Sequence, residues 1–326
     1  MLMSRSSALD ERVMRRLKLR ELRILMTVAQ AGSMGKGAAQ LALSQPAVSK
    51  AIAEMEHTLG VAVLDRTPQG VEPTLYGRAL LKWSSAVFDD LRQGVREIEF
   101  LADPTAGEVR VGSHEVMSAD FLPAVIDRLS RKHPRLVFTV RQAATIPLLY
   151  GDLRERLVDF IFGRMMSPIE HEDLNAEVML ADPLVIVAGS RSKWVRRRSI
   201  DLTELVDEPW CLPPDDLPIV PYVVEAFRSR GLKPPRIAVR SNSPHLHYGM
   251  VRTGRFLAVA PSSTVQLSGA RLGLKPLPMR FAIQPGPIGI VTLRNRTISP
   301  VAQRFIDCAR EFVKLLAKGA TGPRRQ

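Results

Sequence analysis

Residues 32–49 read G-S-M-G-K-G-A-A-Q-L-A-L-S-Q-P-A-V-S, a stretch in which two short helices are expected to follow one another after a tight turn. Ser33 and Ser44 stand where the N-caps of these helices are expected, because a serine hydroxyl accepts a free N–H group of a first helical turn. Pro46 fits the first turn of the second helix, where its missing N–H costs no hydrogen bond. The stretch therefore predicts a helix–turn–helix pair.

A further helix precedes this pair. Apolar residues recur there at helical spacing and end at Gly32, namely Leu22, Leu25, Met26 and Ala29. The helix that follows Ser44 has its own apolar stripe, formed by Val48, Ile52, Met55 and Leu59. Three helices joined by tight turns predict a helix-turn-helix unit of the kind that binds DNA.

The opposite side of the third helix carries small or polar residues. These are Pro46, Ser49, Lys50, Ala53 and His57. A face of this kind lets a helix approach base edges in a major groove. We expect the Gln45 amide to pair with adenine, Lys50 to reach guanine or phosphate, and the Ser44 and Ser49 hydroxyls to bind phosphate oxygens. For each single residue the alternative is an ordinary solvated side chain.

A two-stranded wing is predicted after the third helix. Val61-Ala62-Val63-Leu64 and Val71 flank a turn at Pro68-Gln69-Gly70. Arg66 and Thr67 precede this turn and are expected to lie beside the DNA backbone. A winged helix that does not bind DNA is the alternative for the whole set.

Residues 75–101 predict a helix longer than most globular helices. Val87, Leu91, Gly94, Ile98 and Leu101 are spaced by alternating fours and threes, which is typical of a short coiled coil. A partner helix is therefore expected, and the alternative is an amphipathic helix packed on its own domain. The sequence A-D-P-T-A-G at residues 102–107 then ends the helix and predicts a domain boundary.

The remaining residues predict an α/β fold with mostly parallel sheets. Strand patterns occur at residues 108–112, 136–140, 159–163, 184–188, 236–239, 255–260 and 289–293, and helical patterns at 119–132, 146–157, 219–230, 244–253 and 300–317. In such sheets ligands bind beyond the carboxyl ends of the strands. The residues at those ends are therefore candidates for a ligand site.

The charge of the chain is unevenly distributed. Its 326 residues include 46 Lys and Arg against 33 Asp and Glu, a net charge of +13, which suggests a nucleic acid or an acidic membrane as partner. Residues 1–105 contribute 14 basic and 12 acidic side chains, so +11 lies in the remainder, and this surplus suggests an anionic ligand or flanking DNA as a partner of that half. For the basic cluster Arg191, Lys193, Arg196, Arg197 and Arg198, a solvated loop is the favoured interpretation.

Several classes of protein and chemistry are not expected. No run approaches the roughly 18 apolar residues of a membrane span, and no apolar signal core follows the basic start, so we expect a cytoplasmic protein without a membrane partner. Cys211 and Cys308 cannot complete a zinc site, and a redox switch between them is disfavoured. His114, His245 and His247 form no metal-ligand pattern, since a H-x-H pair on a helix points in two directions. No nucleophile, phosphate-loop or metalloprotease motif occurs, so neither an enzyme nor a cofactor is expected.

Residues 32–49, with Glu54-Met55-Glu56 and Leu59-Gly60-Val61, closely resemble the LysR-type transcriptional regulators. Asp65-Arg66-Thr67 stands where that family commonly has E-R-T, and Thr74-Leu75-Tyr76-Gly77 where it has T-P-A-G. The missing proline leaves Thr74 as the expected N-cap of the long helix. The resemblance implies a winged helix-turn-helix at residues 18–74 and a dimerisation helix at 75–103, with contacts at Val87, Leu91, Ile98 and Leu101.

The same resemblance implies an effector domain at residues 107–318 with two lobes like those of periplasmic binding proteins, 107–180 with 284–318 and 181–283. A small-molecule inducer is expected between the lobes. Strand and helix ends nominate as its contacts Ser113, His114, Gln142, Thr145 and Arg164 from the first lobe, and Ile219, Asn242, Ser243 and Pro261 from the second. Ser113 and Thr145 fall near effector positions of the family, whereas Asn242 and Ser243 are equally good N-caps.

The predicted function is sequence-specific binding of double-stranded promoter DNA, modulated by a small metabolite. The predicted DNA contacts are Ser33, Ser44, Gln45, Pro46, Ser49, Lys50, Arg66 and Thr67. The protein is expected to self-associate as a dimer or tetramer. The run from Pro68 to Arg78 resembles a sugar-responsive branch that regulates galactose-binding-protein operons, and a branch responding to carboxylated aromatic intermediates looks similar, so the effector is a sugar, a sugar acid or another organic acid. The alternatives are a non-specific architectural DNA-binding protein and a solute-binding or enzyme-like protein with an accessory winged helix.

Overall fold

The computed structural model describes residues 11, 13, 15–67, 70–279 and 283–320, with side chains described up to residue 316. These residues form two compact units that divide between Gly94 and Val95. In the described part of the chain, no helix is both long and apolar enough to cross a membrane.

The first unit is a winged helix-turn-helix. Its helices are α2 (Leu19–Ala31), α3 (Met34–Gln40) and α4 (Gln45–Leu59), and its antiparallel wing strands are β1 (Leu64–Thr67) and β2 (Gly70–Pro73). The predicted N-caps are confirmed, since Ser33 Oγ accepts the Lys36 N–H and Ser44 Oγ accepts the Ala47 N–H. Two residues of the predicted wing turn, Pro68 and Gln69, lie outside the described residues.

The core of the winged helix-turn-helix is built on the predicted stripe of α4. Val48, Ile52 and Met55 are at most 1% exposed. Gly37 lets α3 pack closely on α2, because a Cβ at this position would lie 2.8 Å from Val28 Cγ2. These contacts orient α4 with its polar side outward.

A threonine anchors the start of the long helix α5 (Leu75–Ala102). Thr74 Oγ1 accepts the Gly77 N–H at 3.0 Å and donates to the Ala62 carbonyl at 2.8 Å. The predicted cap is therefore confirmed, and it secures the helix start although Leu75 occupies the family's proline position. Gly77 is buried, and a Cβ there would lie 1.9 Å from the Val63 carbonyl oxygen.

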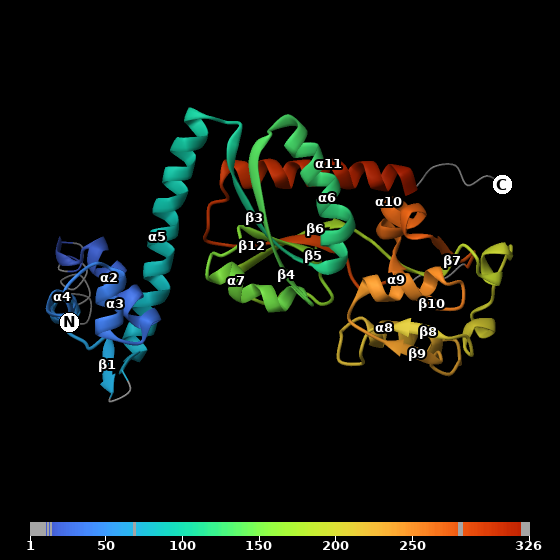
Figure 1. Cartoon of the computed structure of the whole chain (residues 1–326), viewed down its shortest axis with the longest axis horizontal. Coiled ribbons are helices and arrows are strands. Elements are labelled where there is room, and N and C mark those ends of the chain that lie inside the picture. The colour runs from blue at the N-terminus through green and yellow to red at the C-terminus, as the bar shows by residue number, and fades with distance from the viewer. Residues whose placement is uncertain (1–10, 12, 14, 68–69, 280–282, 321–326) are drawn as a thin grey trace, which may run out of the picture. The chain divides into compact units, whose positions relative to one another are not determined.

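The second unit contains two lobes, each with a five-stranded sheet. Lobe 1 has the strand order β4-β3-β5-β12-β6. Its strands are β3 (Ala106–His114), β4 (Arg135–Ala143), β5 (Phe160–Arg164), β6 (Leu174–Leu180) and β12 (Ile288–Leu293), and its helices are α6 (Glu115–Lys132), α7 (Tyr150–Arg154) and α11 (Pro300–Ala320). Figure 1 shows α6 and α11 running alongside this sheet, and their apolar faces meet the strands around Phe121, Phe160 and Phe305.

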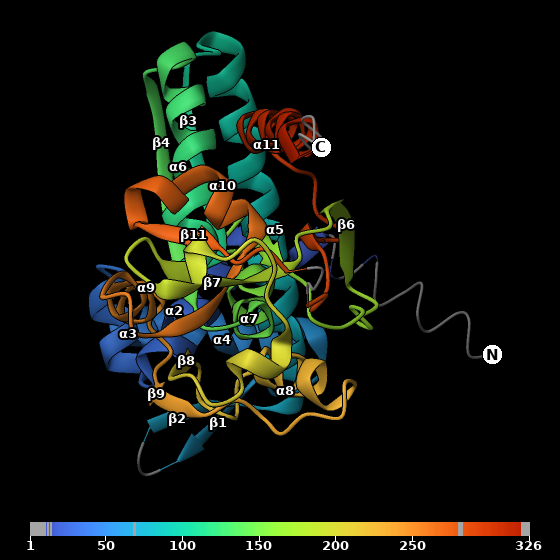
Figure 2. The same ribbon diagram turned by 90° about the vertical axis from the view of Figure 1, so that its right-hand side faces the viewer.

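Lobe 2 has the strand order β11-β7-β10-β8-β9. Its strands are β7 (Leu184–Gly189), β8 (Trp210–Leu212), β9 (Ile237–Arg240), β10 (Leu257–Pro261) and β11 (Leu274–Pro276), and its helices are α8 (Val220–Arg228), α9 (Pro244–Arg252) and α10 (Ser262–Leu272). Trp210 and Phe227 lie at the centre of its main core. Figure 2 shows α10 close to β11, with which it packs.

The predicted fold class is confirmed: the protein is α/β overall, with a winged helix-turn-helix, a long linker helix and a two-lobed α/β domain. The expectation of mostly parallel sheets is wrong, because β12 pairs antiparallel with β5 and β6, and β7 pairs antiparallel with β10 and β11. The physical reason is the double crossover. A strand that enters a lobe from the other lobe runs opposite to strands that start within it.

Smaller differences concern individual elements. Strands β6 and β11 and helix α10 have no counterpart in the sequence expectation. Helix α6 begins at Glu115 instead of residue 119, and the predicted helix 146–157 is a 3-10 turn (Ile146–Leu149) followed by the short α7. Pro147 in the second position of the turn and the left-handed Arg156 (φ 62°) bound this segment.

Candidate DNA-binding face and effector site

The start of α4 presents an exposed polar face. Gln45, Pro46 and Lys50 are exposed, and Ser49 is partly exposed. The Ser44 hydroxyl accepts the Ala47 N–H at 3.3 Å, so its hydrogen is still available to a phosphate oxygen. The structure thus places four of the predicted DNA contacts on one helix face.

The wing brings a further cation to this face. Arg66 Nη2 donates to Ser49 Oγ at 3.2 Å, which joins β1 to α4. Thr67 Oγ1 donates to the Gly70 carbonyl at 3.4 Å, and Lys50 Nζ lies 3.8 Å from Glu54 Oε1. Both cationic side chains are exposed and remain able to pair with phosphate. Ser33 caps α3 and lies at the start of the preceding helix, across the turn from α4.

Helix α5 exposes an apolar stripe. Val87 is 38% exposed, Leu91 48%, Ile98 68% and Leu101 74%, and these are the four predicted dimerisation residues. Trp83, also exposed, lengthens the stripe by one helical turn, and the exposed Val95 lies within it between Leu91 and Ile98. A row of large apolar side chains in water is costly, so this stripe is suited to a partner helix.

On the lobe 1 side of the predicted effector site, two polar residues belong to the scaffold. Ser113 is fully buried and its Oγ donates to the Phe162 carbonyl at 2.8 Å. His114 Nε2 accepts the Arg164 N–H at 3.2 Å, and burial, with the nearby Arg164 charge, lowers the His114 pKa to about 4. His114 is therefore neutral at pH 7.

Two other predicted residues of lobe 1 are available to a ligand. Gln142 is exposed near the end of β4, and Thr145 is partly exposed just before the 3-10 turn. Within the described part of the chain, neither side chain has a hydrogen-bond partner. Both can therefore donate or accept hydrogen bonds to a polar effector.

Arg164 is held at the junction of the two lobes. Its Nη2 pairs with Asp182 Oδ2 at 2.9 Å, and its Nη1 donates to the Asp182 and Gly286 carbonyls at 2.6 and 2.7 Å. The Asp182 carboxylate also accepts hydrogen bonds from Ser262 and Ser263 at the start of α10. This network, which we call the crossover clamp, ties β5 to both crossover segments, near residues 182 and 286, and to lobe 2.

The lobe 2 candidates differ in their availability. Asn242 is exposed, whereas Ser243 Oγ caps α9 by accepting the Leu246 N–H at 3.4 Å. Ile219 packs partly on the core of lobe 2, and Pro261 is buried at the end of β10. Asn242 is thus the lobe 2 candidate with the most accessible polar group.

Several polar contacts between the lobes were not anticipated from the sequence, among them that of Gln266 Nε2 with the Leu316 carbonyl at 3.3 Å. Tyr222 Oη donates to the Met166 carbonyl at 2.9 Å, and His245 Nε2 lies 3.6 Å from Glu115 Oε1. Arg271 Nη2 lies 3.7 Å from Asp120 Oδ1. The contact of Glu115 could not be predicted because the helix was expected to begin four residues later, at residue 119. Tyr222 was predicted to lie in a helix, but nothing in the sequence indicated that its hydroxyl would contact the other lobe.

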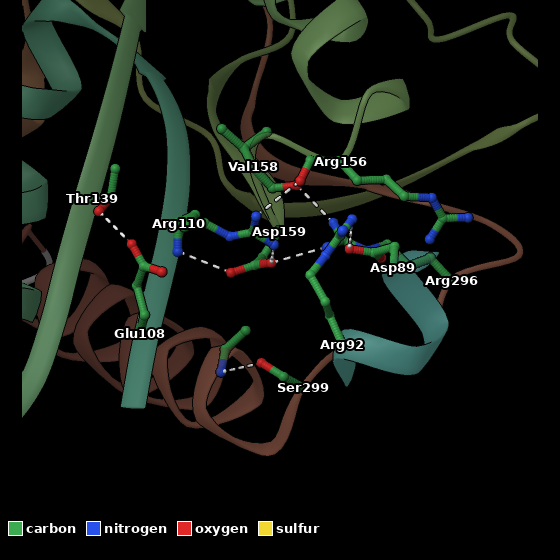
Figure 3. A network of polar contacts seen from close by, with 11 residues as sticks. Asp89, Arg92, Glu108, Arg110, Thr139, Arg156, Val158, Asp159, Arg296 and Ser299 are labelled. Atoms are coloured by element: carbon green, nitrogen blue, oxygen red, sulfur yellow. Dashed lines mark hydrogen bonds and ion pairs between the residues drawn. The ribbon is translucent and has the colours of Figure 1, made fainter. Parts of the chain in front are cut away.

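Other polar clusters support the scaffold of lobe 1. Asp159 accepts hydrogen bonds from Arg110 Nη2 at 2.7 Å and Arg296 Nη2 at 3.1 Å, and Arg296 Nη1 donates to the Val158 carbonyl (Figure 3). The network joins β3, the segment before β5 and the segment before α11. We therefore assign it to stability of the lobe.

The structure bears on the disfavoured chemistries as well. His245 is exposed and His247 is buried, so the two rings point to different surroundings. No group of three or more metal-binding side chains was found among the described residues. Cys211 in β8 and Cys308 in α11 are both free and buried, and burial raises the pKa of both thiols, that of Cys211 to about 11.

An exposed recognition helix with a wing, a long helix with an apolar stripe and a two-lobed α/β domain together define a DNA-binding transcriptional regulator with a domain for a small effector. The comparisons give the particular family. Residues 19–78 match the bacterial regulatory helix-turn-helix of the lysR family, and residues 102–314 match the LysR substrate binding domain. The chain belongs to the LysR family of transcriptional regulators.

Individual relatives agree with this assignment. The chain is 28% identical to the HTH-type transcriptional regulator GbpR of Azospirillum brasilense over 90% of this chain and 86% of that protein. It is 28% identical to the regulator YdcI of Escherichia coli over 91% and 96% of the two chains. Full-length OxyR of Pseudomonas aeruginosa has the same fold, with a TM-score of 0.63 and 22% identity over 92% of this chain and 95% of that one.

Proposed function

We propose that two copies of this regulator read a palindromic promoter site through paired α4 helices, and that a small metabolite bound between lobes 1 and 2 modulates this reading. The observation that carries the proposal is the exposed face around Ser44, Gln45, Ser49 and Lys50, which the wing residue Arg66 joins through Ser49. Such a regulator acts where promoter DNA lies, in the cytoplasm.

The DNA contacts divide into two roles. Gln45 and Lys50 read base edges, because an amide pairs bidentately with adenine and an ammonium reaches guanine. Hydroxyl and guanidinium groups hold the phosphate backbone and fix the register, which are the roles of Ser33, Ser44, Ser49, Arg66 and Thr67. Pro46 is small and rigid at the helix start, so it permits close approach to the groove.

Dimerisation supplies the second reading head. The apolar stripe of α5, with Val87, Leu91, Ile98 and Leu101, pairs with the same stripe of a second copy. Two heads then bind two half-sites, and their combined contacts give specificity that one short helix lacks. A tetramer would pair two such dimers.

The effector is a polar metabolite, a sugar, a sugar acid or another organic acid. Gln142 and Thr145 of lobe 1 and Asn242 of lobe 2 supply its hydrogen bonds, because their side chains are the accessible polar groups among the predicted contacts. Ser113, His114, Arg164, Ile219, Ser243 and Pro261 shape the site and hold its strands and helix ends. Ligand-dependent movement of the lobes shifts the balance between two arrangements of the reading heads.

The test of the DNA-binding proposal is retention of a promoter fragment by the full chain over a series of salt concentrations. Retention of one palindromic site against competitor DNA supports the proposal, whereas equal binding to all sequences supports the architectural alternative. Gln45→Ala should relax base choice at one position by roughly 1–3 kcal/mol, while Arg66→Ala should weaken binding to all sequences alike. Identical behaviour of the two variants would show that the roles are wrongly assigned.

The test of the effector site is a thermal shift of the full chain with a panel of sugars, sugar acids and aromatic acids. A compound that stabilises the wild type should stabilise Gln142→Ala and Asn242→Ala less. Gln303→Ala, on the lobe 1 helix α11, is the matched control and should respond like the wild type. Equal stabilisation of all variants would place the ligand elsewhere.

A further inference from the structure

The positive charge of the effector domain belongs mainly to one lobe. Residues 181–283, which form lobe 2, contain 15 Lys and Arg against 8 Asp and Glu, a net charge of +7. Residues 107–180 and 284–318, which form lobe 1, contain 15 against 13, a net charge of +2. Lobe 2 therefore carries a surplus that lobe 1 of similar size lacks.

Three segments meet at one end of the lobe 2 sheet. Ser190, just after β7, donates its N–H to the Gly273 carbonyl before β11. A Cβ at Gly254 would lie 3.1 Å from Arg191 Cβ, and one at Gly273 would lie 3.3 Å from Arg252 Cγ. The loop after β7, the end of α9 and the start of β11 are therefore neighbours.

These segments carry six exposed cations, which we call the basic face of lobe 2. They are Arg191, Arg196, Arg198, Arg252, Arg255 and Lys275. Neighbouring cations are neutralised within the fold, since Lys193 pairs with Glu208 at 2.8 Å and Arg197 with Glu204 at 3.0 Å. No ion pair of the six was found among the residues that the structure describes. Their charge is thus available to an external anion.

The basic face lies away from the lobe junction. Strand β7 starts at Leu184, two residues after Asp182 of the crossover clamp, and ends at Gly189 beside the basic face. Strand β10 runs the other way, with Leu257 opposite Ala188 and Pro261 opposite Leu184. Arg252 and Arg255 precede β10 and so lie at the far end of the sheet. The basic face is therefore distinct from the proposed effector site.

We propose that the basic face of lobe 2 binds the phosphate backbone of duplex DNA that flanks the operator. Five of its six cations are arginines, whose planar guanidinium groups match phosphate oxygens in a bidentate manner. An extended set of charges also suits an extended polyanion better than one small anion. The choice of DNA as the bound polyanion rests on the proposed function, because DNA held by the reading heads would be present at a high effective concentration near the rest of the molecule.

The experiment compares the full-length wild type with the triple variant Arg191→Ala, Arg252→Ala, Arg255→Ala. The matched control is Lys132→Ala, Arg294→Ala, Lys314→Ala, which removes three exposed cations from lobe 1. Each protein is titrated with a short duplex that contains only the operator and with one extended by about 40 base pairs on each side, over a range of salt concentrations.

The triple variant should bind the extended duplex roughly tenfold or more weakly than the wild type, and the slope of log affinity against log salt should fall by about 2 to 3. On the short duplex it should match the wild type, and the control should match the wild type on both. Unchanged slope on the extended duplex, or equal losses in the control, would overturn the inference. A change in promoter regulation by the triple variant with unchanged DNA binding would also overturn it, since the basic face would then meet a protein. Failure of the wild type to retain the short operator would instead refute the proposed function.

Discussion

Substitution of Asp182 by alanine should destabilise the effector domain by about 3–5 kcal/mol, the usual cost of removing one partner of a buried ion pair. Asp182 is 1% exposed, and its carboxylate accepts hydrogen bonds from Arg164 Nη2, Ser262 Oγ and both the N–H and the hydroxyl of Ser263. Burial lowers the pKa of the Arg164 guanidinium, and Asp182 opposes this effect. Without Asp182 a buried cation would remain with carbonyl partners alone.

The assay is urea unfolding of the full chain followed by tryptophan fluorescence. Trp194 and Trp210 both pack in the core of lobe 2 and so report on the domain that the crossover clamp secures. Asp215→Ala is the matched control, because its ion pair with Arg240 at 3.0 Å is exposed, 67% at Asp215 and 48% at Arg240, and should contribute less than about 1 kcal/mol.

Two results would refute the reasoning. The first is a loss of stability in Asp182→Ala no larger than that in Asp215→Ala. The second concerns the double variant Arg164→Met with Asp182→Ala, which removes the stranded charge and should be less destabilised than the sum of the two single variants. Full additivity would mean that the two groups do not depend on each other.

Three further predictions concern other parts of the chain. His114 has a pKa of about 4 in the folded protein, below its usual 6.5, so as the pH falls the unfolded state binds a proton first and the free energy of unfolding should decrease between about pH 6.5 and pH 4. In urea titrations, His114→Asn should reduce this decrease by up to about 3 kcal/mol. The exposed control His171→Asn should leave the decrease unchanged. Gly77→Ala should lower the free energy of unfolding of the winged helix-turn-helix by about 1–3 kcal/mol, because the added Cβ would overlap the Val63 carbonyl. The control Gly249→Ala, in the open interior of α9, should raise the free energy of unfolding of its domain by about 1 kcal/mol. Unchanged thermal unfolding of Gly77→Ala would contradict the close packing at Gly77. Ile98→Glu should shift the chain toward monomer in light scattering, while Glu97→Ala should not; an unchanged mass for Ile98→Glu would show that the α5 stripe does not mediate self-association.

Much of the winged helix-turn-helix could be predicted because its signals are local. The capping Ser44 and the Ala47 N–H that it accepts lie three residues apart, and the stripe of Val48, Ile52 and Met55 repeats every three or four residues. The same holds for Thr74, which caps α5 despite the absent proline. Local hydrogen bonds and periodicity do not depend on how distant segments fold, so a sequence pattern is enough to predict them.

The effector domain shows where such prediction stops. Ser113 and Arg164 were predicted to follow strands and to contact the ligand, but they lie within the last residues of β3 and β5. Ser113 donates to the Phe162 carbonyl, and Arg164 contacts Asp182 and Gly286, the latter 122 residues away. Strand direction also escaped prediction, because whether β12 runs parallel or antiparallel depends on the crossover that returns the chain from lobe 2. Contacts of this kind arise from chain segments that only the folded topology brings together.

The sequence by itself determined the three helices and wing, the polar face of α4, the apolar stripe of α5 and the size of the charge surplus, since each depends on residue type and spacing within a short segment. Only the tertiary structure decided which of the nominated polar groups are free and which belong to the crossover clamp. It also decided that segments 190–198, 252–255 and 273–275, which carry the cations of the basic face, lie at the same end of the lobe 2 sheet, because sheet pairing places the end of β7 beside the starts of β10 and β11.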